Sequence, residues 1–168
     1  MITLVLGGAA SGKSLIAEEI AGSCGGDVTY VATAVPAPGD TDHAARIAAH
    51  RARRPANWTT VECTAVSDLA QHLRQIVGVA LVDSLGTWIT LHQEFEVVAE
   101  TGDLLAALQD RDAPSVLVSD EVGLAVHPPS EAGRRYADAV GALNQRIAAA
   151  ADRVLLVVAG RALELPRP

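Results

Sequence analysis

Apolar and polar stretches alternate along the chain in a way that predicts strands and helices following each other in turn. Short apolar runs indicate strands at 2–6, 28–32, 58–63, 79–83, 115–119 and 154–158. Helical spacing or composition indicates helices at about 14–21, 41–53, 67–76, 84–100, 103–109 and from 130 onward. Residues 161–165 are expected to add an edge strand. Strands joined by helices favour an α/β fold with a mostly parallel sheet covered by helices on both faces.

Two of these helices have recognisable beginnings. Ser67 is an N-cap residue type, and it precedes Leu69, Leu73 and Ile76 at i, i+4 and i+7 spacing. The sequence Pro128–Ser130 opens the longest expected helix. The apolar face of that helix is expected to consist of Tyr136, Val140, Leu143 and Ile147.

Length and composition favour one domain, residues 1–168, with an aliphatic core. Of the 168 residues, 49% are hydrophobic but only 3% are aromatic, which suits buried parallel strands and closely packed helices. The sequence contains no repeat and no linker long enough to separate two domains. Cys24 and Cys63 lack metal-ligand spacing and are expected to be core thiols.

Charge and hydropathy argue against several classes of protein. A net charge of −7 disfavours nucleic acid as a partner. No apolar stretch approaches the roughly 20 residues of a membrane span. The N-terminal apolar run ends at Gly7 without a basic segment, so we expect no signal peptide and a cytoplasmic location.

The segment between the first strand and the first helix matches the phosphate-binding P-loop pattern. It reads Gly7-x-x-x-x-Gly12-Lys13-Ser14, with the strand before it and the helix after it that the pattern requires. In such a loop, backbone N–H groups and the helix N-terminus surround phosphate oxygens. Lys13 is expected to reach the β- and γ-phosphates, and the Ser14 hydroxyl to ligate Mg²⁺.

Lys13 is also the sole lysine of the chain. The other 12 of the 13 basic residues are arginine. A single ammonium among guanidinium groups indicates a position that needs a compact point charge.

Two acidic positions follow buried strands and are candidates for metal or phosphate chemistry. Asp83 ends the strand at 79–83, where a metal-positioning acid of this fold class lies, although an ordinary N-cap is the alternative. Glu121 follows the strand at 115–119 and is a second candidate.

Basic residues gather on one face of the helix expected at 41–53. Arg46, His50 and Arg53 or Arg54 fall three to four residues apart, as on a single face. This pattern is typical of a solvated basic stripe or, alternatively, of an anion-binding face around a neutral histidine that can attack phosphorus. Glu62 either accepts hydrogen bonds from a guanine or ribose or is a solvated strand residue.

The motifs together resemble a known family, the bifunctional adenosylcobinamide kinase / adenosylcobinamide-phosphate guanylyltransferases of cobalamin biosynthesis. Six ordered blocks carry the resemblance, at Leu6–Ser14, Tyr30–Ala34, Arg46–His50 with Arg54–Glu62, Val82–Trp88, Glu121–Gly123 and Arg134–Gln145. The tail from Ala148 to Gly160 also fits, so the resemblance covers nearly the whole chain.

The resemblance implies a P-loop fold with a RecA-like sheet and two linked activities. ATP or GTP would phosphorylate adenosylcobinamide, and GMP would then pass from GTP to adenosylcobinamide phosphate through a guanylylated histidine, which aligns with His50. Lys13 would join His50 as a catalytic residue, Ser14 and Asp83 would hold Mg²⁺ partly through water, and Arg46 and Glu121 are further candidates. The implied nucleotide-binding residues are Gly7, Gly8, Ala9, Ala10, Ser11, Gly12, Lys13, Ser14, Ala32, Thr33, Ala34, Arg51, Ala52, Arg53, Arg54, Glu62 and Asp83. Family members form homotrimers, so a homotrimer is the implied assembly.

Several positions depart from the family pattern. Ala10 replaces a usual arginine, Ser84–Gly86 replaces Cys-Leu-Thr, and segments 90–93 and 124–128 also differ. These departures leave the P-loop residues intact and concern the substrate side. Two alternatives therefore stay open: a small-molecule kinase without guanylyltransferase activity, and a non-catalytic nucleotide-binding switch or assembly factor. A switch GTPase is disfavoured because its Asn/Thr-Lys-x-Asp motif needs a second lysine.

Overall fold

The computed structural model describes residues 1–34, 47–48 and 51–167. The strands are β1 (Ile2–Gly7), β2 (Val28–Ala32), β3 (Thr59–Glu62), β4 (Val79–Asp83), β5 (Ser115–Asp120), β6 (Arg153–Val158) and β7 (Arg161–Glu164). The helices are α1 (Lys13–Ser23), α3 (Asp68–Gln75), α4 (Leu85–Ile89), the 3₁₀ turn η1 (Gln93–Phe95), α5 (Val98–Gln109) and α6 (Glu131–Ala150). Within the described ranges, no helix combines the length and apolar character that a membrane span needs.

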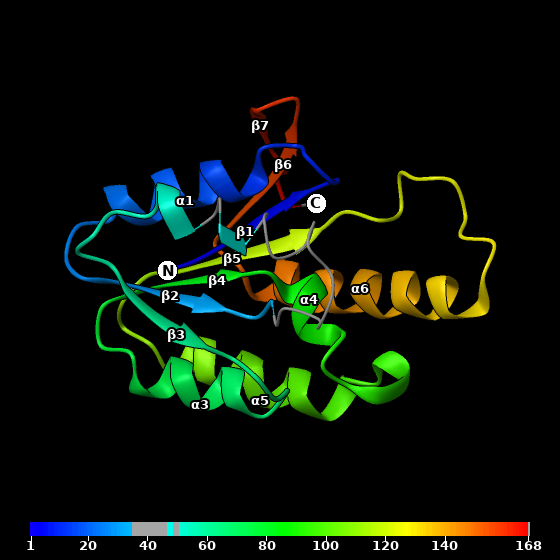
Figure 1. Cartoon of the computed structure of the whole chain (residues 1–168), viewed down its shortest axis with the longest axis horizontal. Helices are drawn as coiled ribbons and strands as arrows, with labels where there is room; N and C mark the ends of the chain where they lie inside the picture. Colours follow the sequence, from blue (N-terminus) through cyan, green and yellow to red (C-terminus); the bar gives the residue numbers. More distant parts are fainter. Residues whose placement is uncertain (35–46, 49–50, 168) are drawn as a thin grey trace.

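The strands form one sheet in the order β3-β2-β4-β5-β1-β6-β7. Every neighbouring pair is parallel except β6 and β7, which are antiparallel. In Figure 1, α1 lies on one side of this sheet, and α3, α4, α5 and α6 lie on the other. The predicted α/β fold with helices on both faces is confirmed.

Alternate residues of the central strands pack into two separate hydrophobic cores, one on each face of the sheet. In β1, Leu4 and Leu6 pack with α3 to α6, whereas Val5 packs with Ala17 and Ala21 of α1. Because side chains of a strand point alternately to its two faces, a strand buried on both sides needs a continuous apolar run. This requirement explains the aliphatic, aromatic-poor composition.

Most predicted elements are confirmed, but the segment 84–100 is not one helix. It contains the short helix α4, the turn η1 and the start of α5 at Val98, five residues before the predicted helix start at 103. Glu94 and Phe95 adopt φ of 59° and 61°, which a continuous α-helix does not allow. Most of the helix expected at 41–53 lies outside the described residues. The parts of it that the structure describes, 47–48 and 51–53, are helical.

The helix caps differ in how well the sequence predicted them. Ser130 caps α6, because its side chain accepts a hydrogen bond from the Gly133 N–H at 3.1 Å. Ser67 lies at the predicted N-cap of α3, but its side chain makes no capping hydrogen bond. The carboxylate of Asp68 instead accepts the N–H groups of Thr64 and Ala65, at 3.1 and 2.8 Å, and so stabilises the turn before the helix.

Candidate active site

The predicted phosphate loop connects β1 to α1 as a compact turn. Gly12 has φ of 93°, which favours glycine, and it supplies no side chain to cap α1. The first-turn N–H groups of a helix lack intrahelical partners and suit an anion. A hydrogen bond of 2.8 Å from the Gly160 N–H to the Ser11 carbonyl ties the loop to the turn between β6 and β7.

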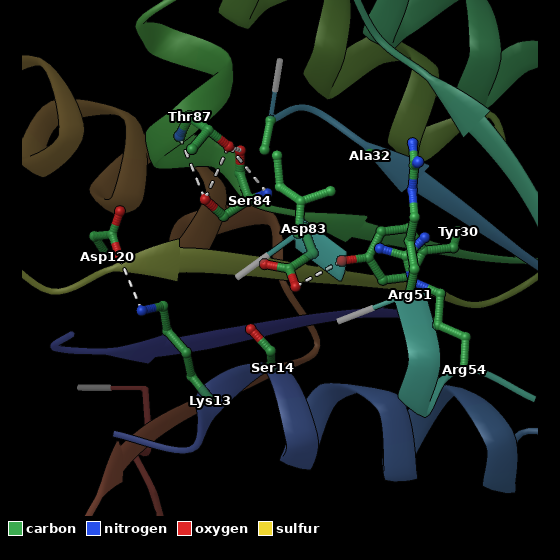
Figure 2. A pocket seen from close by; sticks show the side chains of 12 residues that line it. Lys13, Ser14, Tyr30, Ala32, Arg51, Arg54, Asp83, Ser84, Thr87 and Asp120 are labelled. Carbon is green, nitrogen blue, oxygen red and sulfur yellow. Dashed lines mark hydrogen bonds and ion pairs between the residues drawn. The ribbon is translucent and has the colours of Figure 1, made fainter. Parts of the chain in front are cut away.

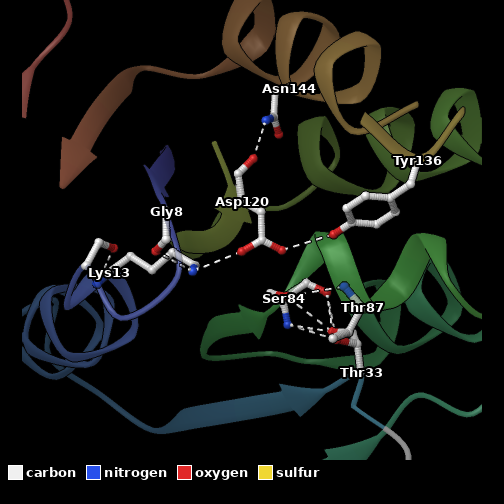
Figure 3. Close-up of polar contacts among 9 residues, drawn as sticks. Gly8, Lys13, Thr33, Ser84, Thr87, Asp120, Tyr136 and Asn144 are labelled. Carbon is white, nitrogen blue, oxygen red and sulfur yellow. Dashed lines mark hydrogen bonds and ion pairs between the residues drawn. The ribbon is translucent and has the colours of Figure 1, made fainter. Parts of the chain in front are cut away.

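Lys13 points across the carboxyl end of the sheet towards β5. Its Nζ lies 2.9 Å from Oδ1 of Asp120 and donates to the Gly8 carbonyl at 3.2 Å. Asp120 pairs in register with Gly7, so the end of β5 lies directly beside the start of the loop. Figure 3 shows the Lys13 ammonium between these two partners.

Asp83 ends β4 and faces the same cavity as Lys13 and Ser14 (Figure 2). Its Oδ2 accepts a hydrogen bond of 2.8 Å from the Tyr30 hydroxyl. Ser84, rather than Asp83, caps α4, because the Thr87 N–H donates to Ser84 Oγ. The N-cap alternative for Asp83 is therefore wrong, and Asp83 lines the pocket.

Tyr30 contacts both the Asp83 carboxylate and the Arg54 guanidinium. Burial, and then the negative charge of Asp83, raise the pKa of the phenol, so it remains a protonated donor. The Arg54 guanidinium stacks over the ring, 3.3 Å from its centroid, and donates to the Thr60 hydroxyl at 3.4 Å. Arg54 is thus held at the mouth of the cavity.

These groups enclose a pocket of about 190 Å³ at the carboxyl ends of the strands. Seven of its lining residues were predicted from the sequence: Lys13, Ser14, Ala32, Ala34, Arg51, Arg54 and Asp83. Five others complete it, namely Tyr30, Ile47, Ser84, Thr87 and Asp120. Topological switch points at strand ends are where open α/β sheets bind ligands.

A second, more open cavity of about 400 Å³ adjoins the first and shares Arg51 and Arg54 with it. Glu62 and Trp58 line this cavity. The Glu62 carboxylate lies 2.5 Å from the Arg51 guanidinium, and both side chains are more than half exposed. The structure thus brings Glu62 beside the first pocket but not into it.

Three other predicted residues have their contacts elsewhere. The buried Thr33 hydroxyl donates to the Ser84 carbonyl at 2.7 Å, so it joins the loops after β2 and β4 beneath the pocket. Arg53 contacts Glu18 of α1 at 3.4 Å, and Ala52 is exposed. These residues support or border the site.

Glu121 faces away from the pocket that contains Lys13. Its carboxylate accepts the N–H groups of Gly123 and Leu124 at 2.9 and 3.0 Å. It lines a different cavity, on the other side of the phosphate loop, together with Ala9 and Ala10. Asp120, one residue earlier, is the acid that reaches Lys13, and it was not predicted from the sequence as a site residue.

Comparison with known proteins shows the family to which the chain belongs. A family model described as cobinamide kinase / cobinamide phosphate guanyltransferase matches residues 3–165. The chain is 42% identical over 175 residues to the bifunctional adenosylcobalamin biosynthesis protein CobP of Pseudomonas aeruginosa, covering all of this chain and 96% of that one. The chain belongs to the cobinamide kinase / cobinamide phosphate guanyltransferase family.

Other members of this family align over nearly their full length. The proteins named CobU of Escherichia coli and Salmonella typhimurium are 37% and 39% identical, with 95% of this chain and 97% of each relative covered. The resemblance inferred from the motifs is confirmed.

Solved structures of low sequence identity share the fold. A KaiC-like protein from Pyrococcus horikoshii has a TM-score of 0.55 at 14% identity, covering 92% of this chain and 71% of that one. An ATPase from a bacterial type III secretion system has a TM-score of 0.54 at 11% identity, covering 92% and 50%. These likenesses confirm the predicted RecA-like P-loop fold.

Two predicted residues, His50 and Arg46, lie outside the described residues. Ile47 and Arg51, which precede and follow His50 in the sequence, both line the pocket. In the described part of the chain, no three His, Cys, Asp or Glu side chains cluster as a protein-only metal site would require.

Proposed function

We propose that this chain phosphorylates adenosylcobinamide with ATP or GTP and then transfers GMP from GTP to adenosylcobinamide phosphate. The products would be adenosylcobinamide-GDP and pyrophosphate. The observation that carries the proposal is the convergence of Lys13, Ser14 and Asp83 on one pocket beside Arg51 and Arg54. Full-length membership in the family supports the same two reactions.

The phosphate loop and Lys13 would bind the triphosphate in both reactions. Backbone amides of residues Gly7–Ser14 and the positive end of α1 attract phosphate oxygens, and the ammonium balances their charge. Lys13 is nearly buried, with 13% of its side chain exposed, so its field on a bound phosphate is weakly screened by water. Removal of this charge should impair both activities.

Mg²⁺ fits two oxygen donors that line the same pocket as Lys13. The Ser14 hydroxyl and the Asp83 carboxylate are hard ligands of the kind Mg²⁺ takes in nucleotide sites, alongside water and phosphate. When bound, the ion would neutralise charge that develops between the β- and γ-phosphates. Tyr30 holds Asp83 in orientation for this role.

The nucleoside would extend towards the second cavity. Ala32 and Ala34 line the first cavity, Arg51 and Arg54 line both cavities, and Glu62 lies in the second. A carboxylate at that position can accept hydrogen bonds from the guanine N–H groups or from ribose hydroxyls. The assignment of Glu62 to the guanosine rests on this placement.

His50 would carry GMP between the two halves of the transfer. A neutral imidazole nitrogen attacks the α-phosphorus of GTP, and the bond to the leaving pyrophosphate breaks. Arg54, which lines the pocket, would attract the phosphate, and the charges of Arg46 and Arg53, close to His50 in the sequence, would disfavour an imidazolium. The lining role of Ile47 and Arg51, its close neighbours in sequence, supports His50 in this step.

We also propose that the chain is a single cytoplasmic domain that assembles as a homotrimer. Light scattering should then give about three times the chain mass of 17.4 kDa. A monomer at working concentration would contradict the assembly without affecting the proposed chemistry.

Product analysis with labelled GTP tests the two activities. Label in the γ-phosphate should appear in adenosylcobinamide phosphate, and label in the α-phosphate should appear in adenosylcobinamide-GDP. His50→Ala should retain the first product and lose the second. A wild-type protein that makes only the first product would instead be a kinase, and one that makes neither would contradict the proposed function.

A further inference from the structure

Two carboxylates line the described part of the pocket, and they lie on different sides of it. Figure 2 shows Asp83 beside Tyr30 and above Ser14, whereas Asp120 is at the other end, in contact with Lys13. Asp83 is accounted for by the magnesium role proposed above. Asp120 has no role in the proposed chemistry so far.

Three contacts fix the orientation of Asp120 (Figure 3). Lys13 Nζ lies 2.9 Å from Oδ1, the Tyr136 hydroxyl donates to Oδ2 at 3.1 Å, and the Asn144 amide donates to the backbone carbonyl at 2.9 Å. With 29% of its side chain exposed, the carboxylate remains accessible from the pocket. Burial raises the pKa of Tyr136, so its phenol stays a donor.

Gly86 leaves the space in which Asp120 and Tyr136 meet. A Cβ at this position would lie 2.1 Å from Asp120 Oδ2 and 2.7 Å from the Tyr136 hydroxyl oxygen, closer than real Cβ contacts. Glycine is a poor helix former, yet it lies inside α4. Glycine at position 86 thus lowers the helix propensity of α4 but leaves room for the contact between the Asp120 carboxylate and the Tyr136 hydroxyl.

The two proposed reactions differ in their need for a proton acceptor. A hydroxyl group that attacks a phosphorus must lose its proton. The imidazole of the guanylylation step attacks through an unprotonated nitrogen, and the phosphate that later accepts GMP is already an anion. Only phosphorylation therefore requires a base in the pocket.

We propose that Asp120 is the proton acceptor of the phosphorylation step and that Tyr136 is its positioning residue. This inference rests on the proposed function. The substrate hydroxyl oxygen forms a bond to the γ-phosphorus, the bond from that phosphorus to the β-phosphate oxygen breaks, and ADP or GDP leaves with the electron pair. When the Lys13 ammonium binds phosphate, it leaves Asp120, and the substrate hydroxyl takes its place beside Oδ1. The hydroxyl proton then passes to Asp120 Oδ1.

Asp120→Asn separates a proton acceptor from a mere support for Lys13. We expect single-turnover phosphorylation of adenosylcobinamide to fall by about 100-fold or more, the range typical of a lost general base. Formation of the protein–GMP adduct from GTP and Mg²⁺ should remain close to wild type, which also shows that the variant is folded. If both reactions fall together, Asp120 only positions Lys13, which contradicts the proposal. If phosphorylation is unchanged, Asp120 is not the proton acceptor.

Two further variants sharpen the test. Tyr136→Phe should lower kcat for phosphorylation with an unchanged KM, because the carboxylate remains but is less well oriented. Asp120→Ala should be partly rescued by formate for phosphorylation; no rescue would contradict a proton-acceptor role. Asp110→Asn, an exposed carboxylate at the C-cap of α5, is the matched control and should leave both reactions unchanged.

Wild-type protein distinguishes failure of this inference from failure of the proposed function. Absence of both products in wild type would contradict the function itself. Full phosphorylation by Asp120→Asn, with normal products from wild type, would overturn only the role of Asp120.

Discussion

Tyr30 shows how one buried side chain connects two parts of the site. Its hydroxyl orients Asp83, and its ring supports the Arg54 guanidinium. The raised pKa of the phenol means that both contacts persist throughout the physiological pH range.

Tyr30→Phe should weaken nucleotide binding specifically in the presence of Mg²⁺. A hydrogen bond to a charged group contributes about 1.5 kcal/mol, so we expect a loss of roughly tenfold in affinity. Calorimetry with and without Mg²⁺ measures this difference. An equal loss without the metal would argue against the role of Tyr30 in orienting Asp83.

The two cysteines should differ in reactivity. Burial, and then the negative charge of Asp68, raise the pKa of Cys63 to about 12, whereas Cys24 is partly exposed. Because the thiolate is the reactive form, only about one in ten thousand Cys63 thiols is reactive at pH 8. A disulfide reagent should label Cys24 first and Cys63 only on unfolding. Equal labelling rates in the native protein would contradict this burial.

At the same scale, the sequence identified the residues whose type and spacing are distinctive. Lys13, Ser14 and Asp83 were predicted because the P-loop pattern and a strand-terminal acid carry local information. Asp120 was missed because its role depends on the pairing of Gly7 with Asp120, which brings together residues over a hundred positions apart.

At the scale of elements, Arg111 joins the end of α3 to the start of β4. Its guanidinium donates to the carbonyls of Leu73 at 2.6 Å, Ile76 at 2.5 Å and Gly78, and its Nε donates to the Ser115 hydroxyl at 3.0 Å. The carbonyls at the end of a helix need such partners when they are buried.

Arg111→Met should destabilise the fold by about 3 kcal/mol, because several backbone carbonyls lose their donor. Nucleotide binding should be unchanged, since Arg111 lies near the amino ends of the strands and the pocket lies at their carboxyl ends. Urea unfolding measures the loss. Arg74→Met, which removes an exposed ion pair with Asp103, is the control and should have little effect. Equal effects of the two variants would contradict the account.

Two helical glycines should respond to alanine with opposite signs. Gly86→Ala should cost about 1–3 kcal/mol, because the added Cβ meets Asp120 and Tyr136. Gly102→Ala in α5 meets no atom within 4 Å and should stabilise by up to about 1 kcal/mol through helix propensity. Thermal unfolding of both variants compares them directly. A stabilised Gly86→Ala would contradict the close packing around Asp120.

The missed boundaries within segment 84–100 also belong to this scale. Apolar composition predicted helix there, but Trp88 is buried and its indole N–H donates to the Val66 carbonyl at 3.0 Å. That tertiary contact and the positive φ values of Glu94 and Phe95 redirect the chain between α4 and α5. Local propensity does not encode either feature.

At the scale of the whole molecule, the sequence predicted the layers but not the order of the strands. The runs at β4 and β5 are both aliphatic, so their pattern shows that they are buried but not which strand each one pairs with. The observed order places β5 between β4 and β1, which brings Asp83, Asp120 and the phosphate loop to one edge. The site is therefore a product of topology as much as of motif.

The central claim is that this edge holds the triphosphate of GTP while a histidine accepts its GMP. Intact-protein mass spectrometry after incubation with GTP and Mg²⁺ tests it most directly. We expect wild type to gain the mass of one GMP in an acid-labile, base-stable linkage, and Lys13→Ala and His50→Ala to gain none. An unmodified wild-type protein, or an adduct that persists in His50→Ala, would contradict the account.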